Sequence, residues 1–475
     1  MAIWCRYLHN DKTKYTSLRM KRLLTSFIMF ILMASTAIAQ ELSYSLCFDG
    51  KNNRIRVELS LLPQRTGTET FTYGEPQFGG QNDIIDCFRD LRVKGAAEWS
   101  FDKDSRKISI TPRAVGKKVV IRYDVIGEPT SEDDFQAELF RPMISETMLY
   151  CHGLNLFLTP ESQNLMQRIH WKKKPSFPVV QLWQPDVPTS DTQRIHPMQV
   201  YMSLMVGRVD MDIESVKFQQ VNGYVLTDLP ENKQANRPLI ADFFVRSMSA
   251  LRSFWGEEET ADTYVLSVLP FSERITHEAG GIALTGGFCS KYRPYADRDT
   301  ILTPGIRFNL AHEMGHKWLG GTLSLGMENQ WFHEGFNDYL TFVTLHESGL
   351  LNDDEYATLW NQMLDRYYGF PEHTLSNEKI LENYWKIGEY NKLPYWRGCI
   401  FAGYLDRIIS ATSKGERSWR DFMRNLNAVC EKNGKITVND FIRVLQPMLP
   451  PALNAKDLLD SHIFSGEDIG RDLVS

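Results

Sequence analysis

Two histidines four residues apart, His312 and His316, constrain the fold of this chain more than any other feature. The stretch from Phe308 to Trp318 contains no proline and is expected to be helical. An α-helix has about 3.6 residues per turn, so side chains four positions apart project from the same face. Both imidazoles can therefore reach one metal ion.

A third metal ligand is expected at Glu334, eighteen residues after His316. A catalytic zinc takes three protein ligands at about 2.0–2.2 Å and leaves its fourth position to water. Glu334 lies at the beginning of a second apolar segment, which we expect to be helical as far as Ser348, with Gly349 just past its end. The sequence therefore predicts one Zn²⁺ per chain, held by side chains from two helices.

Glu313 is the candidate catalytic base. It follows the first ligand and on a helix projects about 100° away from it, which places it beside the metal and not on it. Zinc lowers the pKa of a bound water to about 7, and a carboxylate beside it can take the proton and later pass it to the leaving amine. A structural zinc site needs no such residue. The motif alone also arises by chance on surface helices, so it is interpreted together with Glu334.

The pattern HExxH followed eighteen residues later by Glu resembles the gluzincin metallopeptidases. Within them the chain is most similar to the glycyl aminopeptidase family and next to the aminopeptidase N family, with Trp331 and Gly335 flanking Glu334 as in these families. The resemblance implies a multidomain α+β protein. Its expected parts are an N-terminal antiparallel β domain, a thermolysin-like zinc catalytic domain and a C-terminal α-helical domain. Glycyl aminopeptidases usually also carry a PDZ domain, and no stretch of this chain has room for one.

The segment Leu393–Gly398 resembles the family segment Tyr-x-Lys-Gly, with Arg397 in place of the lysine. The resemblance implies that Tyr395 donates a hydrogen bond to the oxyanion of the tetrahedral intermediate, since a hydroxyl aimed at developing charge lowers a barrier. Taken alone, a tyrosine after a proline is typical of a core aromatic residue.

Two further residues near Glu334 are candidates for supporting roles. Asp338 lies one turn beyond it and could accept a hydrogen bond from the outer nitrogen of a zinc-binding histidine, which would fix the tautomer. A solvent-facing helix carboxylate is the alternative. His333 stands where aminopeptidase N relatives carry asparagine, and we expect it to support the site or to contact substrate without binding the metal.

The segment Gly280–Leu284 departs from the family pattern. Relatives have Gly-x-Met-Glu-Asn or Gly-Gly-Leu-Glu-His here, and the resemblance implies that the matching residues bind substrate: Gly280, Gly281, Ile282 and Ala283. Ala283 replaces the glutamate that grips the α-ammonium group of the substrate, which removes the counter-charge for a free amino terminus. Glu278 faces the other side of a strand unless the two glycines form a bulge. The choice between exopeptidase and endopeptidase action therefore stays open.

The first 39 residues are expected to be removed on export. Met20-Lys21-Arg22, the apolar run Leu23–Met33 and Ala37-Ile38-Ala39 have the three regions of a secretory signal peptide, with cleavage near Ala39. The apolar run is too short to span a membrane, and no other stretch reaches the roughly 18 apolar residues that a span needs. We expect a periplasmic or secreted protein without a stable membrane span. Either Met1 or Met20 is the start.

Charge and cysteine content narrow the classes of partner. Of 53 basic and 59 acidic residues, residues 1–39 contain six and one, which leaves 47 and 58 and a net charge of −11. A nucleic acid partner is therefore not expected. Six cysteines remain, none in a CxxC pair, and their spacing leaves open whether any disulfide forms.

Local patterns divide the chain into four expected segments: residues 1–39 (extension and signal peptide), 40–160 (N-terminal β domain), 161–348 (thermolysin-like catalytic domain) and 349–475 (C-terminal helical domain). Alternating stretches such as Arg54–Leu61 indicate the β domain. A proline-rich connector is expected over Pro160–Pro188. Strands over Gln199–Val206 and Thr263–Phe271, with a helix over Ala241–Phe254 between them, are expected ahead of the metal site.

Three functions remain open from the sequence. The leading one is an exported zinc-dependent metallopeptidase that hydrolyses peptide or protein substrates in an aminopeptidase-like manner. The second is a zinc hydrolase with endopeptidase or non-peptide (ester or epoxide) specificity, because Ala283 replaces the amine-anchoring glutamate. The third is a non-catalytic binding protein on a peptidase scaffold. The presence of Glu313 and Tyr395 argues against it, because neither is needed to hold the metal. The oligomeric state and the preferred side chain stay open.

Overall fold

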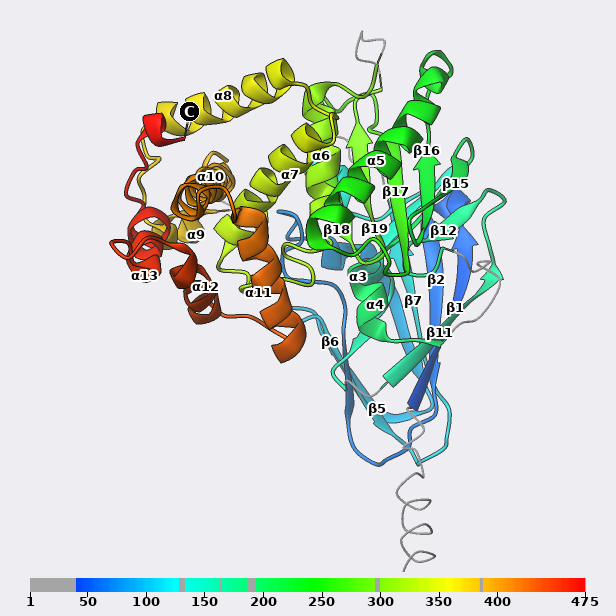
Figure 1. The fold of residues 1–475 in the computed structure, drawn as a ribbon. Helices are drawn as coiled ribbons and strands as arrows, with labels where there is room; N and C mark the ends of the chain where they lie inside the picture. Colours follow the sequence, from blue (N-terminus) through cyan, green and yellow to red (C-terminus); the bar gives the residue numbers. More distant parts are fainter. Residues whose placement is uncertain are drawn as a thin grey trace, which may run out of the picture.

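The structure is a computed structural model, and it describes residues 40–127, 133–162, 165–185, 194–294, 300–384 and 388–474 (Figure 1). The expected extension and signal peptide, residues 1–39, lie outside the described residues. Across the described ranges, no helix is both long and apolar enough to cross a bilayer. The chain places a β-rich region on one side, a helical region on the other and a mixed sheet between them.

Three sheets make up the N-terminal β-rich region, as far as the structure describes it. In spatial order their strands are β13 (Arg194–Ile195), β11 (Leu165–Lys173), β1 (Gln40–Asp49), β2 (Arg54–Leu61), β7 (Val119–Ile126) and β4 (Phe88–Lys94); then β10 (Thr159–Pro160), β3 (Glu69–Thr72), β6 (Lys107–Pro112) and β5 (Ala96–Asp102); then β12 (Val179–Gln181), β14 (Leu204–Arg208), β9 (Met148–His152) and β8 (Met143–Ile144). Along β2 the buried side chains are Ile55, Val57, Leu59 and Leu61. This period of two is expected for a sheet with one face in the core.

The β-rich region extends past the expected domain boundary at residue 160. β11 pairs in parallel with β1, and β14 pairs with β9. The described strand pairs within residues 40–160 are antiparallel, as expected, and the parallel pair arises where β11 joins β1. One expectation is wrong: the stretch Pro160–Pro188 is not only a connector, because β11 and β12 lie in it. The buried side chains of Leu165 and Ile169 explain why β11 joins the sheet. The strand expected over Gln199–Val206 also begins late, since the short helix α4 (Pro197–Tyr201) occupies its first half.

A five-stranded mixed sheet separates the two regions. Its spatial order is β15 (Asp212–Phe218), β16 (Val221–Thr227), β17 (Asp262–Pro270), β19 (Gly287–Tyr292) and β18 (Ala279–Leu284). Neighbouring residues of β17 face opposite cores: Val265 packs with the N-terminal sheets and Leu266 packs with the helices. β18 pairs only with β19 in this sheet, so its other edge borders the helices.

Helices cover the other face of this sheet and continue to the C-terminus. They are α5 (Arg237–Trp255), α6 (Pro304–Gly315), α7 (Phe336–Glu347), α8 (Asp353–Gly369), α9 (Asn377–Asn383), α10 (Leu393–Ser413), α11 (Trp419–Asn433), α12 (Val438–Leu445) and α13 (Ala455–Leu459). One hydrophobic core runs from α5 and α7 through α10 to α12, so packing does not stop at the expected boundary at residue 348. The fold is mixed α+β with a β-rich N-terminal region and a helical C-terminal region, as the sequence predicts.

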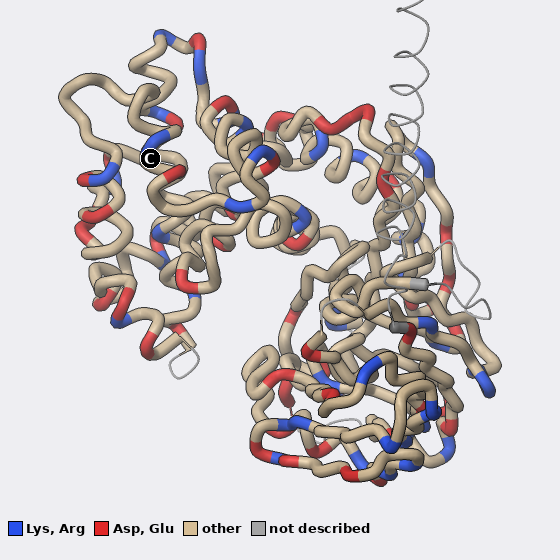
Figure 2. Tube along the Cα trace, turned by 90° about the horizontal axis from the view of Figure 1, so that it is seen from below, with Lys and Arg blue, Asp and Glu red and all other residues tan. Residues whose placement is uncertain are grey.

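Charges of both signs are interspersed along both regions, and no long run of Lys and Arg stands out on the described trace (Figure 2). The six cysteines that the structure describes are unbridged, and all except Cys47 are buried.

Candidate active site

Helix α6 carries the two histidines. Thr303 caps its N-terminus through a hydrogen bond from the backbone N–H of Ile306, and Pro304 occupies the first turn, where no N–H partner is lost. The helix ends at Gly315, earlier than the expected end at Trp318, so His316 is the capping residue. Its backbone keeps helical angles, and the imidazoles of His312 and His316 lie perpendicular with ring centroids 4.7 Å apart.

Glu334 comes from a π-helical turn, Trp331–Gly335, that leads directly into α7. Its Oε2 lies 3.2 Å from Nε2 of His312 and 3.2 Å from Nε2 of His316. The two Nε2 atoms are 3.1 Å apart. The structure thus brings together one potential ligand atom from each predicted metal-binding residue.

The hydrogen bonds of the outer nitrogens indicate that this donor set fits a cation. Nδ1 of His316 lies 2.9 Å from the carbonyl oxygen of Leu319, and Nδ1 of His312 lies 2.7 Å from Oδ1 of Asp338. A carbonyl and a carboxylate only accept, so both Nδ1 atoms carry the hydrogen. The Nε2 atoms of the neutral rings then present lone pairs to each other and to a carboxylate. Such an arrangement is repulsive unless a positive charge, either a proton on one ring or a metal ion, lies between them.

The pKa values in the cluster point the same way. Burial lowers the pKa of His312, but the carboxylates of Asp338 and Glu334 outweigh it and raise that pKa to about 10. Burial acts to raise the pKa of Glu334, whereas His316 and His312 hold it well below its usual range. The cluster therefore favours positive charge at its centre, which a divalent metal supplies.

Glu313 lies beside this cluster, against the edge strand β18. A Cβ atom on Gly281 would be 2.7 Å from Cγ of Glu313 and 3.1 Å from its Oε1, so only a glycine leaves room for this carboxylate. Glu313 is 9% exposed, and burial raises its pKa, although His316 and His312 act in the opposite direction. A carboxylate with a raised pKa is suited to exchange protons near neutral pH.

Tyr395 reaches the cluster from α10. Its ring is nearly parallel to that of His312, at 19° and 5.8 Å between centroids. The π turn and α10 approach closely at two glycines, because a Cβ on Gly335 would lie 2.4 Å from Cα of Gly398. Burial and the nearby Glu334 raise the pKa of Tyr395 well above its usual value, so its hydroxyl remains a hydrogen-bond donor.

Arg397, which replaces the family lysine, is buried away from this chemistry. Its guanidinium donates to the carbonyl oxygens of His373 and Leu375, both at 2.6 Å, and of Ile463 at 3.3 Å. Arg397 therefore links α10 to the segment before α9 and to the turn after α13.

A cavity of about 630 Å³ opens over Glu313, His312 and Tyr395. Its lining comes from β18, from the short helix α2 (Phe135–Phe140) of the β-rich region and from α6, α7, α8 and α10. Aromatic and apolar side chains predominate, with amide and charged groups between them: Phe135, Leu139, Phe140, Phe308, Phe342, Leu359, Met363, Trp396, Gln136, Asn309, Gln362, Asn391, Arg366 and Lys392. This composition is typical of a ligand site.

The predicted substrate-binding residues are distributed over both faces of β18. Gly280 and Gly281 line the cavity, whereas Ile282 and Ala283 do not. Ile282 is 7% exposed and packs into the core of the β-rich region. Ala283 lies two positions beyond Gly281, on the strand face directed at Glu313.

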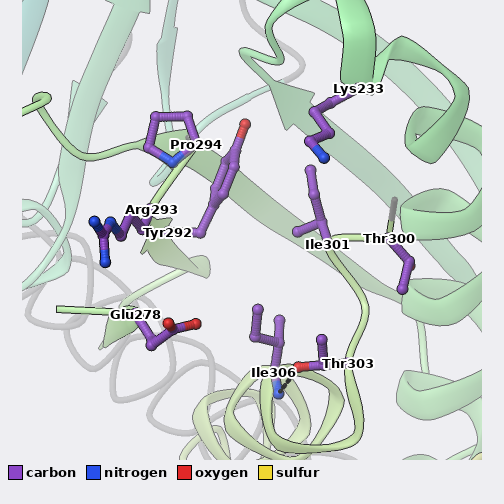
Figure 3. Close-up of a pocket in the computed structure, with 9 residues that line it drawn as sticks. All are labelled: Lys233, Glu278, Tyr292, Arg293, Pro294, Thr300, Ile301, Thr303 and Ile306. Atoms are coloured by element: carbon purple, nitrogen blue, oxygen red, sulfur yellow. Dashed lines mark hydrogen bonds between the residues drawn. The ribbon is translucent and has the colours of Figure 1, made fainter. Parts of the chain in front are cut away.

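Glu278 does not replace the missing carboxylate. The pairing of β18 with β19 is regular from Ala279 to Leu284, so the two glycines form no bulge. Glu278 lines a separate pocket of about 20 Å³. Figure 3 shows it there with Thr303 and Ile306 from the beginning of α6.

His333 is directed away from the cavity, which it does not line. Its Nε2 is 3.0 Å from Oγ of Ser324 and accepts from the backbone N–H of Leu325 at 3.2 Å. Of the two roles expected for His333, this position favours support of the site. His333 fixes the loop after α6, the same loop whose Leu319 carbonyl orients His316.

Sequence reasoning missed the contribution of α2 and of the segment before Tyr395. Phe135 stacks on His277 with ring centroids 3.9 Å apart and 7° between planes, and Leu139 packs where a Cβ of Gly280 would lie. Tyr384 and Lys392 line the cavity beside Tyr395. No local pattern marks α2 as part of the site, because it approaches β18 only through the tertiary fold.

Comparison with known proteins finds a likeness in fold. The crystal structure of an aminopeptidase N family protein from Idiomarina loihiensis superposes with a TM-score of 0.73, over 91% of this chain and 77% of that chain. The chain has an aminopeptidase-N-like fold. Sequence identity in the superposition is 15%. No protein-family profile matches the chain, and no curated protein matches it either.

Proposed function

We propose that this chain is an exported zinc-dependent peptidase in which His312, His316 and Glu334 hold the metal. The observation that carries the proposal is the position of Glu313: a buried carboxylate, confined by Gly281, beside three converging ligand atoms and at the base of a cavity. The likeness to an aminopeptidase N family protein supports the peptide as substrate class. The signal peptide expected in residues 20–39 supports export.

When bound, zinc polarises the scissile carbonyl and makes water acidic enough to be activated near neutral pH. Glu313 takes the proton from the attacking water and passes it to the leaving nitrogen, a role that its raised pKa favours. The hydroxyl of Tyr395 donates to the carbonyl oxygen as negative charge develops there. Asp338 holds the ring of His312 in the tautomer that leaves Nε2 free.

The extended substrate lies along the free edge of β18. An edge strand presents unpaired backbone N–H and C=O groups, to which a peptide can add as a further strand. Gly280 and Gly281 lie in the part of this edge that lines the cavity, next to Glu313.

A second candidate is a zinc hydrolase with endopeptidase or non-peptide specificity. Ala283 supplies no counter-charge for a free amino terminus, and Glu278 lies in a different pocket. Comparing hydrolysis of free and N-acetylated peptides, esters and epoxides distinguishes this candidate from an aminopeptidase. The third candidate, a binding protein without activity, is supported only if zinc is bound and no substrate in a broad library is turned over.

The direct test of the proposal is the Glu313→Gln variant. We expect kcat to fall by about 10²–10⁴, as is typical for loss of a general base, with zinc content unchanged. Glu355→Gln is a matched control, because Glu355 pairs with Arg307 away from the cavity. Unaltered peptide turnover in Glu313→Gln enzyme that still contains zinc contradicts the proposal.

A further inference from the structure

The cavity is lined by two cationic side chains, Lys392 and Arg366, that the proposed chemistry does not use. Among its described lining residues only Glu313 and Asp338 are acidic, and Asp338 is bonded to His312. The side chains of Lys392 and Arg366 are both exposed. Neither forms an ion pair with any residue that the structure describes.

Lys392 lies near the reacting groups. Its Nζ is 4.5 Å from the centroid of the Tyr395 ring, which in turn lies 5.8 Å from the ring of His312. An extended peptide advances roughly 3.3–3.6 Å per residue, so a group on Lys392 is within about three residues of a bond held at Glu313. Lys392 also acts on His277 in the cavity wall, since burial and then this positive charge lower the pKa of that imidazole.

The remaining polar groups of the cavity are neutral. Four amides, of Gln136, Asn309, Gln362 and Asn391, line it, and the side-chain oxygens of Asn309 and Asn391 are buried without a hydrogen-bond partner. Amides bind peptide N–H and C=O groups, whereas an ammonium group requires a carboxylate that is not already committed. The described lining offers none.

We propose that this site selects peptides with a carboxylate within about three residues of the scissile bond, bound by Lys392 with Arg366 at the cavity rim. The inference rests on the proposed peptidase function and adds the substrate class to it. The carboxylate comes either from an Asp or Glu side chain or from the C-terminus of a short peptide, since both present the same group to an ammonium ion.

Matched N-acetylated peptides test the proposal on the full mature chain with zinc. One series places Glu or Gln at each of the three positions on either side of the cleaved bond, and a second compares C-terminal acids with C-terminal amides. We expect kcat/KM to be about 10-fold higher for the acidic member at one position, as for a charge-assisted hydrogen bond. The position identifies the source of the carboxylate.

Variants assign the preference to residues. We expect Lys392→Gln to bring the Glu/Gln ratio of kcat/KM close to one, and Lys392→Glu to reverse it in favour of Lys-containing peptides. Lys435→Gln is the control, because Lys435 is equally exposed but does not line the cavity. Only the ratio is compared, so a general effect of the substitutions on Tyr395 cancels.

The outcomes separate the two proposals. Hydrolysis of all peptides at equal rates leaves the peptidase function standing and overturns the carboxylate selectivity. A preference that survives unchanged in a Lys392→Gln, Arg366→Gln double variant overturns the assignment to these residues. If no peptide is hydrolysed by enzyme that contains zinc, both proposals fall.

Discussion

The two sides of the cavity differ in how far they keep the features of the family that the sequence resembles. The helical wall, formed by α6, the π turn, α7 and α10, brings together the metal-binding triad, Glu313 and Tyr395. The strand wall, formed by β18 and α2, has alanine at position 283 and no uncommitted carboxylate among its described lining residues. Under the proposed function, the groups for hydrolysis therefore lie on the helical wall, whereas the strand wall lacks the carboxylate that the family resemblance predicts for substrate selection.

Among the substitutions that compare the two walls, the largest effect is expected at Gly281, where the walls touch. Gly281→Ala places a Cβ 2.7 Å from Cγ of Glu313 and forces that carboxylate to move. A displacement of about 1 Å in a catalytic group costs roughly 100-fold in rate, so we expect kcat/KM to fall by about that factor. Gly369→Ala, a site with open space around it, is the control for handling and fold. Wild-type turnover in Gly281→Ala would show that Glu313 does not act from the position seen here.

The next effect is confined to the helical wall. Asp338→Asn weakens the hydrogen bond that orients His312, and loss of such a partner typically reduces metal affinity by about 10- to 100-fold. A zinc titration against a competing chelator measures it. Asp353→Asn is the control, since Asp353 also bonds a histidine, at Nε2 of His346 and 2.8 Å, but on the surface. Equal zinc affinities in the two variants would contradict the role of Asp338 in orienting His312.

A gain of function is expected on the strand wall. Ala283→Glu returns a carboxylate to the strand face directed at the reacting groups. We expect the preference for free over N-acetylated peptides to rise by about 10-fold, the usual scale of one charge-assisted hydrogen bond. The ratio of the two kcat/KM values is the measurement. Ala97→Glu, at an exposed position on β5 that does not line the cavity, controls for the added charge. An unchanged ratio would mean that the strand wall takes no part in selecting the amino terminus.

Substitution of His152, which is buried next to α2, is expected to change activity least but to change the pH dependence of the free energy of unfolding. The backbone carbonyl of Leu139 accepts hydrogen bonds from Tyr150 and His152, both at 2.7 Å. Burial lowers the pKa of His152 to about 4, below its ordinary 6.5. Because the folded state resists protonation, its contribution to stability is complete above pH ~6.5 and is lost as the pH falls towards ~4, at up to about 1.4 kcal/mol per pH unit.

Urea unfolding between pH 7 and pH 4.5 measures this dependence. We expect a shallower loss of stability in His152→Gln, whose amide can keep the bond to Leu139, and the wild-type slope in His346→Gln, a surface control. Equal slopes in all three proteins would contradict the buried neutral state of His152.

The helical wall could be predicted from the sequence because its information is local or nearly so. His312 and His316 lie on one helix, Glu334 and Asp338 lie one turn apart, and α7 ends beside Gly349, which has φ +67°. The strand wall could be predicted only in part. The lost carboxylate at Ala283 was visible, but the contribution of α2 was not, since it reaches β18 across a domain interface.

The extent of the β-rich region past residue 160 could not be predicted for a similar reason. β11 joins β1 in a parallel pair more than a hundred residues apart in sequence, and no local pattern specifies such a partner. The role of His333 could not be predicted either. It is adjacent in sequence to Glu334, but its ring contacts Ser324, in a loop whose path depends on tertiary packing.

The central claim is that one divalent cation is held by His312, His316 and Glu334. Titration of the chelator-treated mature chain with zinc, followed by peptide hydrolysis, tests it most directly. We predict one zinc per chain, recovery of activity in step with zinc binding, and loss of both in His316→Ala but not in His346→Ala. Zinc binding that is absent, or that persists unchanged in His316→Ala, would contradict it.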